Sequence, residues 1–212
     1  ERGLVQPSEF IAVAEETGLI VPIGMWVIRR VAEKLAIWAR DARTSSLTLS
    51  VNVSARQFRD EEFLSQALQI LRDTGVPHYR MNMELTESLL VEDIQQIIYK
   101  MKVLKSAGVA FSLDDFGTGY SSLSYLRRLP LDELKIDHSF FRNVLTEEAD
   151  AAIVRTIVVL AQSLKLRLIA EGVETERQKA FLVSHGCHAY QGFLFGEAVP
   201  EDKLDESVDA WV

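Results

Sequence analysis

The sequence predicts an α/β fold, namely a (β/α)₈ TIM-type barrel whose first two strands are missing from this chain. Strand and helix patterns alternate at intervals of about 30 residues, which is typical of βα units on a parallel sheet. A polar residue lies near the carboxyl end of nearly every strand pattern, as in barrel active sites. The Gly-rich phosphate fingerprint of the open dinucleotide-binding sheets is absent, so the closed barrel is favoured over the open sheet.

The strand patterns are segments in which apolar and polar residues alternate with period two. They are residues 48–54, 80–86, 109–114, 134–137, 166–171 and 189–195. A closed barrel needs eight strands, and the chain opens directly into a helix pattern that should follow a strand. We therefore expect two strands to be missing upstream, which would leave this chain weakly active or inactive by itself.

The helix patterns carry apolar residues at helical spacing, as Ile94, Ile97 and Met101 do. They are residues 7–17, 22–40, 61–74, 92–107, 149–164 and 176–185. Gly75 and Gly108 each follow such a pattern, and glycine is the usual residue just beyond a helix end. These patterns leave no long linker between them.

The bulk composition suits one domain spanning residues 1–212, because 48% of the residues are apolar. No apolar run approaches the length that crosses a bilayer, and no signal peptide is visible, so no membrane contact by this domain is expected. Cys187 is the single cysteine, which excludes an internal disulfide and favours the cytoplasm. The missing initiator Met predicts further domains upstream, which could tether the domain.

The net charge of the chain is -8, so DNA and RNA are not expected partners. A small phosphate ligand is still compatible with this charge, because a bound divalent metal reverses the charge locally. The oligomeric state is left open by the sequence, with a homodimer as one alternative.

One face of the strand patterns carries polar residues that would converge at the barrel mouth. They are Asn52, Glu84, Asp114, Lys135, Glu171 and Gln191. Three of them are carboxylates, which repel one another in one cavity, so a hard cation such as Mg²⁺ or Mn²⁺ is the expected compensation. Asp115 directly follows Asp114, so the pair could reach two cations, with Asp114 bridging. The alternative is that this Asp-Asp segment is only a turn or a helix cap.

These segments resemble the EAL-domain family of cyclic di-GMP-specific phosphodiesterases. The motifs that carry the resemblance are Val51-Asn-Val-Ser54, Glu84-Leu-Thr-Glu-Ser88, Asp114-Asp-Phe-Gly-Thr-Gly-Tyr-Ser-Ser-Leu123, Leu134-Lys-Ile-Asp137, Glu171-Gly-Val-Glu174 and Gln191-Gly192. The resemblance runs from Gly3 to Pro200, and the Glu-Ala-Leu motif would lie just before the start of this chain. By the same resemblance, that motif's glutamate is a further metal ligand on the second missing strand.

The resemblance implies hydrolysis of cyclic di-GMP to linear pGpG with a two-metal site of Mg²⁺ or Mn²⁺, in bacterial second-messenger signalling. The implied metal ligands are Asn52, Glu84, Asp114, Asp115 and Glu171. Lys135 would position or deprotonate the attacking water, and Glu171 would join the catalytic group. Glu87 would assist by anchoring residues 116–122, unless it is only a capping acid. The remaining implied residues, which contact substrate or water or orient the ligands and Lys135, are Gln191, Asp137 and Glu174.

Two other functions remain as alternatives. A catalytically silent receptor would bind cyclic di-GMP without cutting it, although such proteins typically lose metal ligands that are intact here. Another barrel enzyme could use Lys and Mg²⁺ to abstract a proton next to a carboxylate. Lys135 could also be a purely structural ion-pair partner of Asp137. The segment His185-Gly-Cys-His188 has the spacing of a metal clip, but we expect a surface turn there.

Overall fold

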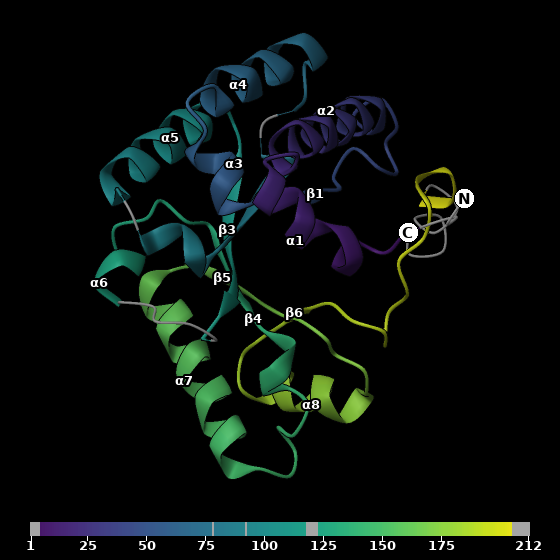
Figure 1. Cartoon of the computed structure of the whole chain (residues 1–212). Helices are drawn as coiled ribbons and strands as arrows, with labels where there is room; N and C mark the ends of the chain where they lie inside the picture. The colour runs from purple at the N-terminus through teal and green to yellow at the C-terminus, as the bar shows by residue number, and fades with distance from the viewer. Residues whose placement is uncertain (1–4, 78, 92, 118–122, 205–212) are drawn as a thin grey trace. The chain divides into compact units, whose positions relative to one another are not determined.

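The structure is a computed structural model, and it describes residues 5–77, 79–91, 93–117 and 123–204 (Figure 1). The chain divides into two compact units, Glu1–Phe111 and Ser112–Val212. Strands and helices alternate along both units, and every strand pairing among the described residues is parallel. The predicted α/β class with parallel strands is therefore confirmed.

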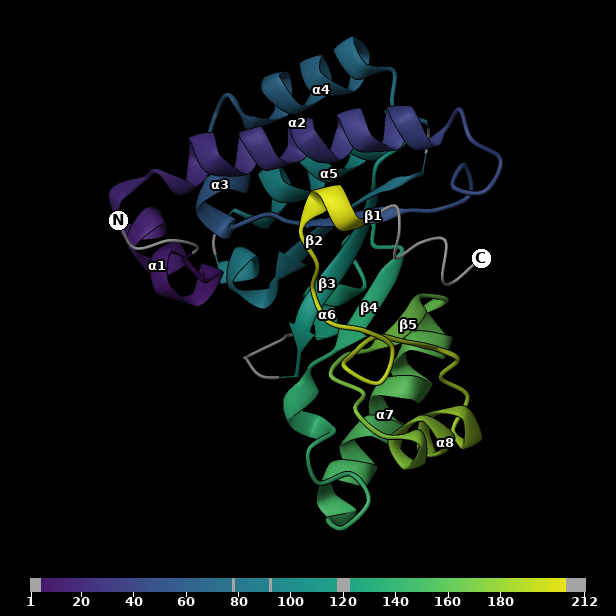
Figure 2. The same ribbon diagram turned by 90° about the vertical axis from the view of Figure 1, so that its right-hand side faces the viewer.

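The first unit contains all the described helices that precede the third strand. Its elements are α1 (Pro7–Thr17), α2 (Ile20–Trp38), β1 (Leu49–Asn52), α3 (Ala55–Arg59), α4 (Phe63–Thr74), β2 (Met81–Thr86), η1 (Glu87–Val91) and α5 (Ile94–Ser106). Helix α2 packs against β1 and runs beside α4 (Figure 2). Strands β1 and β2 pair in parallel, with Asn52 opposite Glu84. This register brings the ends of the two strands to the same edge.

An aromatic cluster and a buried lysine fix the short helix α3 inside the first unit. The ring of Phe58 lies 5.0 Å from that of Phe63 and 6.2 Å from that of Phe111, measured between centroids. The Nζ of Lys100 donates to the carbonyls of Phe58 (2.9 Å) and Asp60 (2.6 Å) at the end of α3. The buried ammonium thereby donates to carbonyls at the C-terminal end of α3, where helical partners run out.

The second unit contains the larger run of paired strands. Its elements are β3 (Ala110–Phe116, whose first two residues belong to the first unit), α6 (Leu123–Leu126), β4 (Glu133–Ile136), η2 (His138–Phe140), α7 (Glu148–Leu164), β5 (Arg167–Ala170), α8 (Glu176–Ser184), β6 (Ala189–Tyr190) and η3 (Glu201–Lys203). Strand β4 pairs with both β3 and β5, and β5 also pairs with β6. Helix α7 packs on β4 and β5. Side chains at the carboxyl ends of β3, β4 and β5 consequently lie at one edge.

The expected strand at 189–195 is wrong over most of its length, because β6 ends at Tyr190. Gly192 has a φ of 152°, and a Cβ there would lie 2.3 Å from the backbone nitrogen of Val173. The chain therefore turns at Gly192 instead of continuing as a strand, and Phe193 is exposed. No helix within the described ranges is long and apolar enough to span a bilayer.

Candidate active site

Three carboxylates at the ends of β3 and β5, the two strands that pair with β4, form the centre of the site. Asp114 and Asp115 lie near the end of β3, and Glu171 directly follows β5. Each offers one oxygen, and these oxygens all lie within 4.8 Å of one another. Among the described residues this is the single cluster of its kind. Its donors are all carboxylate oxygens, which suit a hard divalent cation.

The backbone of β3 explains how two consecutive aspartates reach one cluster. Successive side chains of a regular strand point to opposite faces, so alternation alone would separate Asp114 from Asp115. Asp115 has a φ of 53°, in the left-handed region, and the register between β3 and β4 shifts between Leu113 and Phe116. Aspartate tolerates this conformation better than most residues do. The irregularity turns the second carboxylate toward the first.

Lys135 of β4 lies among these carboxylates and is almost fully buried. Its Nζ forms ion pairs with Asp114 Oδ1, at 3.3 Å, and with Glu171 Oε1. The same Glu171 oxygen accepts a hydrogen bond of 2.6 Å from Gln191 Nε2. The structure thus brings together five of the residues singled out from the sequence.

Asp137 follows β4 directly and is held by its own neighbours. It accepts hydrogen bonds of 2.9 Å from the backbone N–H of Ser139 and lies 2.9 Å from His138 Nδ1. Burial by itself would raise the pKa of Asp137, but these contacts outweigh burial and hold the pKa below its usual value. His138 is not among the residues predicted to act in the site, although the adjacent Asp-His pair in the sequence is a signal that could have indicated it.

The pKa of Asp115 reflects burial and uncompensated negative charge in the carboxylate cluster. Burial raises the pKa of this carboxyl, and the negative charges of Asp114 and Asp137 raise it further. Lys135 opposes this increase without cancelling it. A cation bound at these oxygens would remove the repulsion, so the residues present fit a divalent metal.

The residues predicted in the first unit occupy the ends of its two paired strands. Asn52 ends β1 opposite Glu84 of β2, and the backbone N–H of Val53 donates to the Glu84 carbonyl at 2.9 Å. Glu84 is buried, whereas Asn52 is exposed. Glu87 opens η1 and is half-buried. Residues 118–122 of the segment that it was expected to anchor lie outside the described residues.

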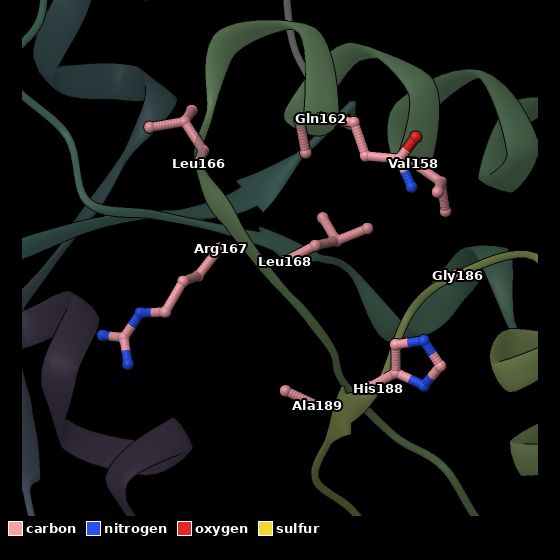
Figure 3. A pocket seen from close by; sticks show the side chains of 9 residues that line it. Val158, Gln162, Leu166, Arg167, Leu168, Gly186, His188 and Ala189 are labelled. Carbon is pink, nitrogen blue, oxygen red and sulfur yellow. The ribbon is translucent and has the colours of Figure 1, made fainter.

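Two small cavities of the second unit lie apart from the carboxylate cluster. Glu174 lines the first, of about 130 Å³, together with His138, Arg142, Gly172 and Gln178. The second cavity, of about 280 Å³, is lined by α7, the start of β5 and the segment leading into β6 (Figure 3). Its lining includes none of the candidate site residues. His188, from the segment with the spacing of a metal clip, lines this second cavity.

Comparison with known proteins decides the family. The profile of the EAL domain family matches residues 1–198 of this chain. The chain belongs to the EAL domain family. The EAL domain resembles the cyclic di-GMP phosphodiesterase PdeR of Escherichia coli, with 43% identity over 200 residues that make up 94% of this chain and 30% of PdeR. The bifunctional diguanylate cyclase/cyclic di-GMP phosphodiesterase MucR of Pseudomonas aeruginosa is 41% identical over 98% of this chain and 30% of MucR.

Solved EAL structures share the fold of this chain. The MucR phosphodiesterase in complex with c-di-GMP superposes with a TM-score of 0.91 at 40% identity, covering 96% of this chain and 82% of that one. The EAL domain of Mycobacterium smegmatis DcpA gives a TM-score of 0.83 at 36% identity, covering 88% and 84% of the two chains. This EAL chain spans about 30% of the length of the two curated relatives above.

Mn²⁺ is expected to raise the melting temperature of this EAL domain more strongly as the pH rises. In the metal-free protein, the raised pKa of Asp115 means that the folded state binds more protons than the unfolded state above pH 3.8, the ordinary pKa of an aspartate. Stability therefore falls as the pH rises from that value through the folded pKa, and a cation competes with the proton that is lost. Thermal melts with and without Mn²⁺ at several pH values measure this.

The matched control for the pH series is Asp115→Asn, which cannot titrate. Its Mn²⁺ effect should be smaller and should depend less on pH in the same window. Asp137 does not interfere, because its lowered pKa changes stability only below its usual range. A Mn²⁺ effect on melting that is the same at every pH would contradict the assigned role of Asp115.

Proposed function

We propose that this EAL domain hydrolyses one phosphodiester bond of cyclic di-GMP to give linear pGpG, in a metal-dependent reaction. The observation that carries the proposal is the cluster of Asp114, Asp115 and Glu171, with the buried Lys135 paired to two of these carboxylates. The similarity to two proteins named as cyclic di-GMP phosphodiesterases supports this substrate. The net charge of -8 gives no support to a nucleic-acid substrate.

The proposed cation is Mg²⁺ or Mn²⁺, bound as a pair. Its proposed oxygen ligands in the structure are Asp114, Asp115 and Glu171. The family resemblance adds Asn52 and Glu84 to this proposed set. When bound, such ions polarise the phosphodiester and lower the pKa of a water molecule. The ligand set contains no sulfur or histidine, which favours these two hard cations over zinc or copper.

Lys135 is proposed to handle the proton of the attacking water. In the structure its ammonium is stabilised by Asp114 and Glu171. Neutralisation of those carboxylates would weaken this stabilisation, and in a buried site the neutral amine is then favoured. A neutral amine next to the reacting water would accept its proton. Gln191, through its bond to Glu171, would hold that carboxylate in place and face the substrate.

The supporting residues are assigned on weaker contacts. Asp137 would orient the site through its position beside Asp115, and the side chain of Glu174 would act at its edge. Glu87 would anchor the segment after β3. Closure of the strands into a (β/α)₈ barrel belongs to the same proposal and is supported by the parallel pairing with intervening helices. The proposed function also includes a cytoplasmic location and assembly as a homodimer.

Chromatography of cyclic di-GMP after incubation with the longest protein that the gene encodes tests the proposal. We expect pGpG to appear with Mg²⁺ or Mn²⁺ and to be suppressed by Ca²⁺, which is larger and tolerates a looser geometry. No product should form with a chelator. Tight binding of cyclic di-GMP without any product under Mn²⁺ would instead support a receptor.

A further inference from the structure

We propose that Gln178 is a positioning residue, which holds the Glu171 loop (residues Glu171–Thr175) in the conformation that presents Glu171 to the metal. The inference deepens the proposed function, on which it rests. Gln178 lies in the first turn of α8, is buried, and is not among the residues predicted to act in the site. Its side chain nevertheless contacts the loops that follow two of the strands of the site.

The amide of Gln178 makes hydrogen bonds in two directions. Its Oε1 accepts from the backbone N–H groups of Glu174 and Thr175, both at 2.9 Å, at the far end of the Glu171 loop. Its Nε2 donates at 3.0 Å to the carbonyl of Phe141, just after η2. Both ends of one buried amide are therefore satisfied by main chain that no helix or strand otherwise holds.

The Glu171 loop is constrained along its length, so its far end affects its start. The backbone N–H of Glu171 donates to the backbone carbonyl of Ile136 at 3.1 Å. The backbone N–H of Val173 donates to the backbone carbonyl of Gln191 at 3.0 Å. Gly172 has a φ of 68°, and a Cβ there would lie 2.5 Å from the Cβ of His138. The loop is thus held against Ile136, His138 and Gln191 at three consecutive residues.

The contact with Phe141 reaches the other side of the site. The N–H of Phe141 donates to the His138 carbonyl at 3.0 Å, and the N–H of Phe140 donates to the Asp137 carbonyl at 3.2 Å. The turn that carries Asp137 is thus tied to the Glu171 loop through a single side chain. Release of Gln178 would remove the bonds that its side chain makes to the N–H groups of Glu174 and Thr175, and would leave the Phe141 carbonyl with only the longer bond of 3.4 Å from the Val144 N–H. These losses favour rearrangement of both loops.

Two substitutions separate the two halves of this contact. Gln178→Met removes every hydrogen bond of the amide at similar volume. Gln178→Glu keeps an oxygen that accepts from Glu174 and Thr175 but places a second oxygen against the Phe141 carbonyl. We expect Gln178→Met to weaken Mn²⁺ binding by about 10-fold, the low end of the usual effect for a group bonded directly to a metal ligand, because Gln178 acts on Glu171 only through the loop. The loss in Gln178→Glu should be smaller, because the Glu171 loop is still held.

The matched control is Val158→Ala, which shortens a buried side chain of α7 in the cavity of Figure 3. It should lower the melting temperature without changing the Mn²⁺ affinity. Calorimetric titration with Mn²⁺ and thermal melting are run on the same preparations, without nucleotide. Gln178→Met with unchanged Mn²⁺ affinity would overturn the inference and leave Gln178 as an ordinary helix cap.

The nucleotide assay then distinguishes failure of the inference from failure of the proposed function. If the unsubstituted protein binds Mn²⁺ and Gln178→Met weakens that binding, the positioning role holds even where no pGpG forms, and only the proposed reaction fails. If the unsubstituted protein does not bind Mn²⁺, both proposals are wrong. Turnover that falls in Gln178→Met through kcat at high Mn²⁺, with KM for cyclic di-GMP unchanged, would support the inference further.

Discussion

Asp114→Asn is expected to abolish metal-dependent hydrolysis of cyclic di-GMP. The substitution keeps the size of the side chain and removes one negative charge from the centre of the carboxylate cluster. Asp114 is buried, contacts Lys135 and belongs to the carboxylate cluster that would hold the cations. We expect a loss of more than about 10³-fold in kcat, above the 10- to 100-fold typical of residues that only orient a ligand. Chromatography of pGpG under Mn²⁺ measures it.

Asp73→Asn is a suitable control for this experiment, because Asp73 is an exposed residue of α4 and the change in net charge is the same. Its turnover should equal that of the unsubstituted protein. The metal-free Asp114→Asn protein should not be much less stable than the parent, because repulsion by Asp115 falls when the charge is lost. Normal turnover in Asp114→Asn would remove Asp114 from the metal site and return the Asp-Asp segment to the role of a turn.

Lys135→Ala is expected to reduce kcat by about 10²- to 10⁴-fold, the usual effect of removing a proton-transfer group. Mn²⁺ affinity and KM for cyclic di-GMP should change little, because Lys135 carries no ligand oxygen. Removal of the ammonium leaves Asp114 and Glu171 without a buried ion pair, so turnover should be compared at saturating Mn²⁺, where the cations compensate those charges. Single-turnover kinetics measure the step directly.

Lys135→Arg separates proton transfer from charge. Arginine retains the positive charge but does not deprotonate in proteins, so it should restore the ion pairs and leave kcat low. A kcat in Lys135→Ala close to that of the parent protein would show that Lys135 is structural. Recovery of full turnover in Lys135→Arg would likewise assign the residue an electrostatic role without proton transfer.

Local pattern was sufficient to predict the elements that are long and periodic. The helix expected at 149–164 is α7, and the strand expected at 80–86 is β2, each within one residue of its observed bounds. Helix α3 has five residues, which is too short for a helical period to be seen. The strand expected at 189–195 failed because its alternation continues past Tyr190, where β6 ends, and Gly192 lies too close to the backbone of Val173 to carry a side chain. Contacts between distant segments decided that case.

In the candidate site, too, strand pattern predicted some features and contacts between distant segments determined others. Asp114, Lys135, Glu171 and Gln191 were predicted to converge because each ends or follows a strand, and in the second unit they lie together. The approach of Asp115 to the same cluster depends on its backbone angle, which strand alternation does not predict. The bond from Gln178 to Phe141 joins residues 37 positions apart, so only the folded chain reveals it. In the structure Thr175 and Gln178 form a capping box at the start of α8, a local pairing that does not indicate this second contact.

The left-handed backbone at Asp115 also restricts how this position could change during evolution. Glutamate would keep the charge, but it lacks the short polar side chain that lets aspartate adopt the left-handed conformation. Most residues other than glycine, asparagine and aspartate lose about 1–2 kcal/mol there. Glycine and asparagine would accept the backbone and lose the charge. Aspartate combines the carboxylate with tolerance of this backbone conformation. A chain in which asparagine or glycine replaces it is expected to keep the local fold and to bind a divalent cation more weakly.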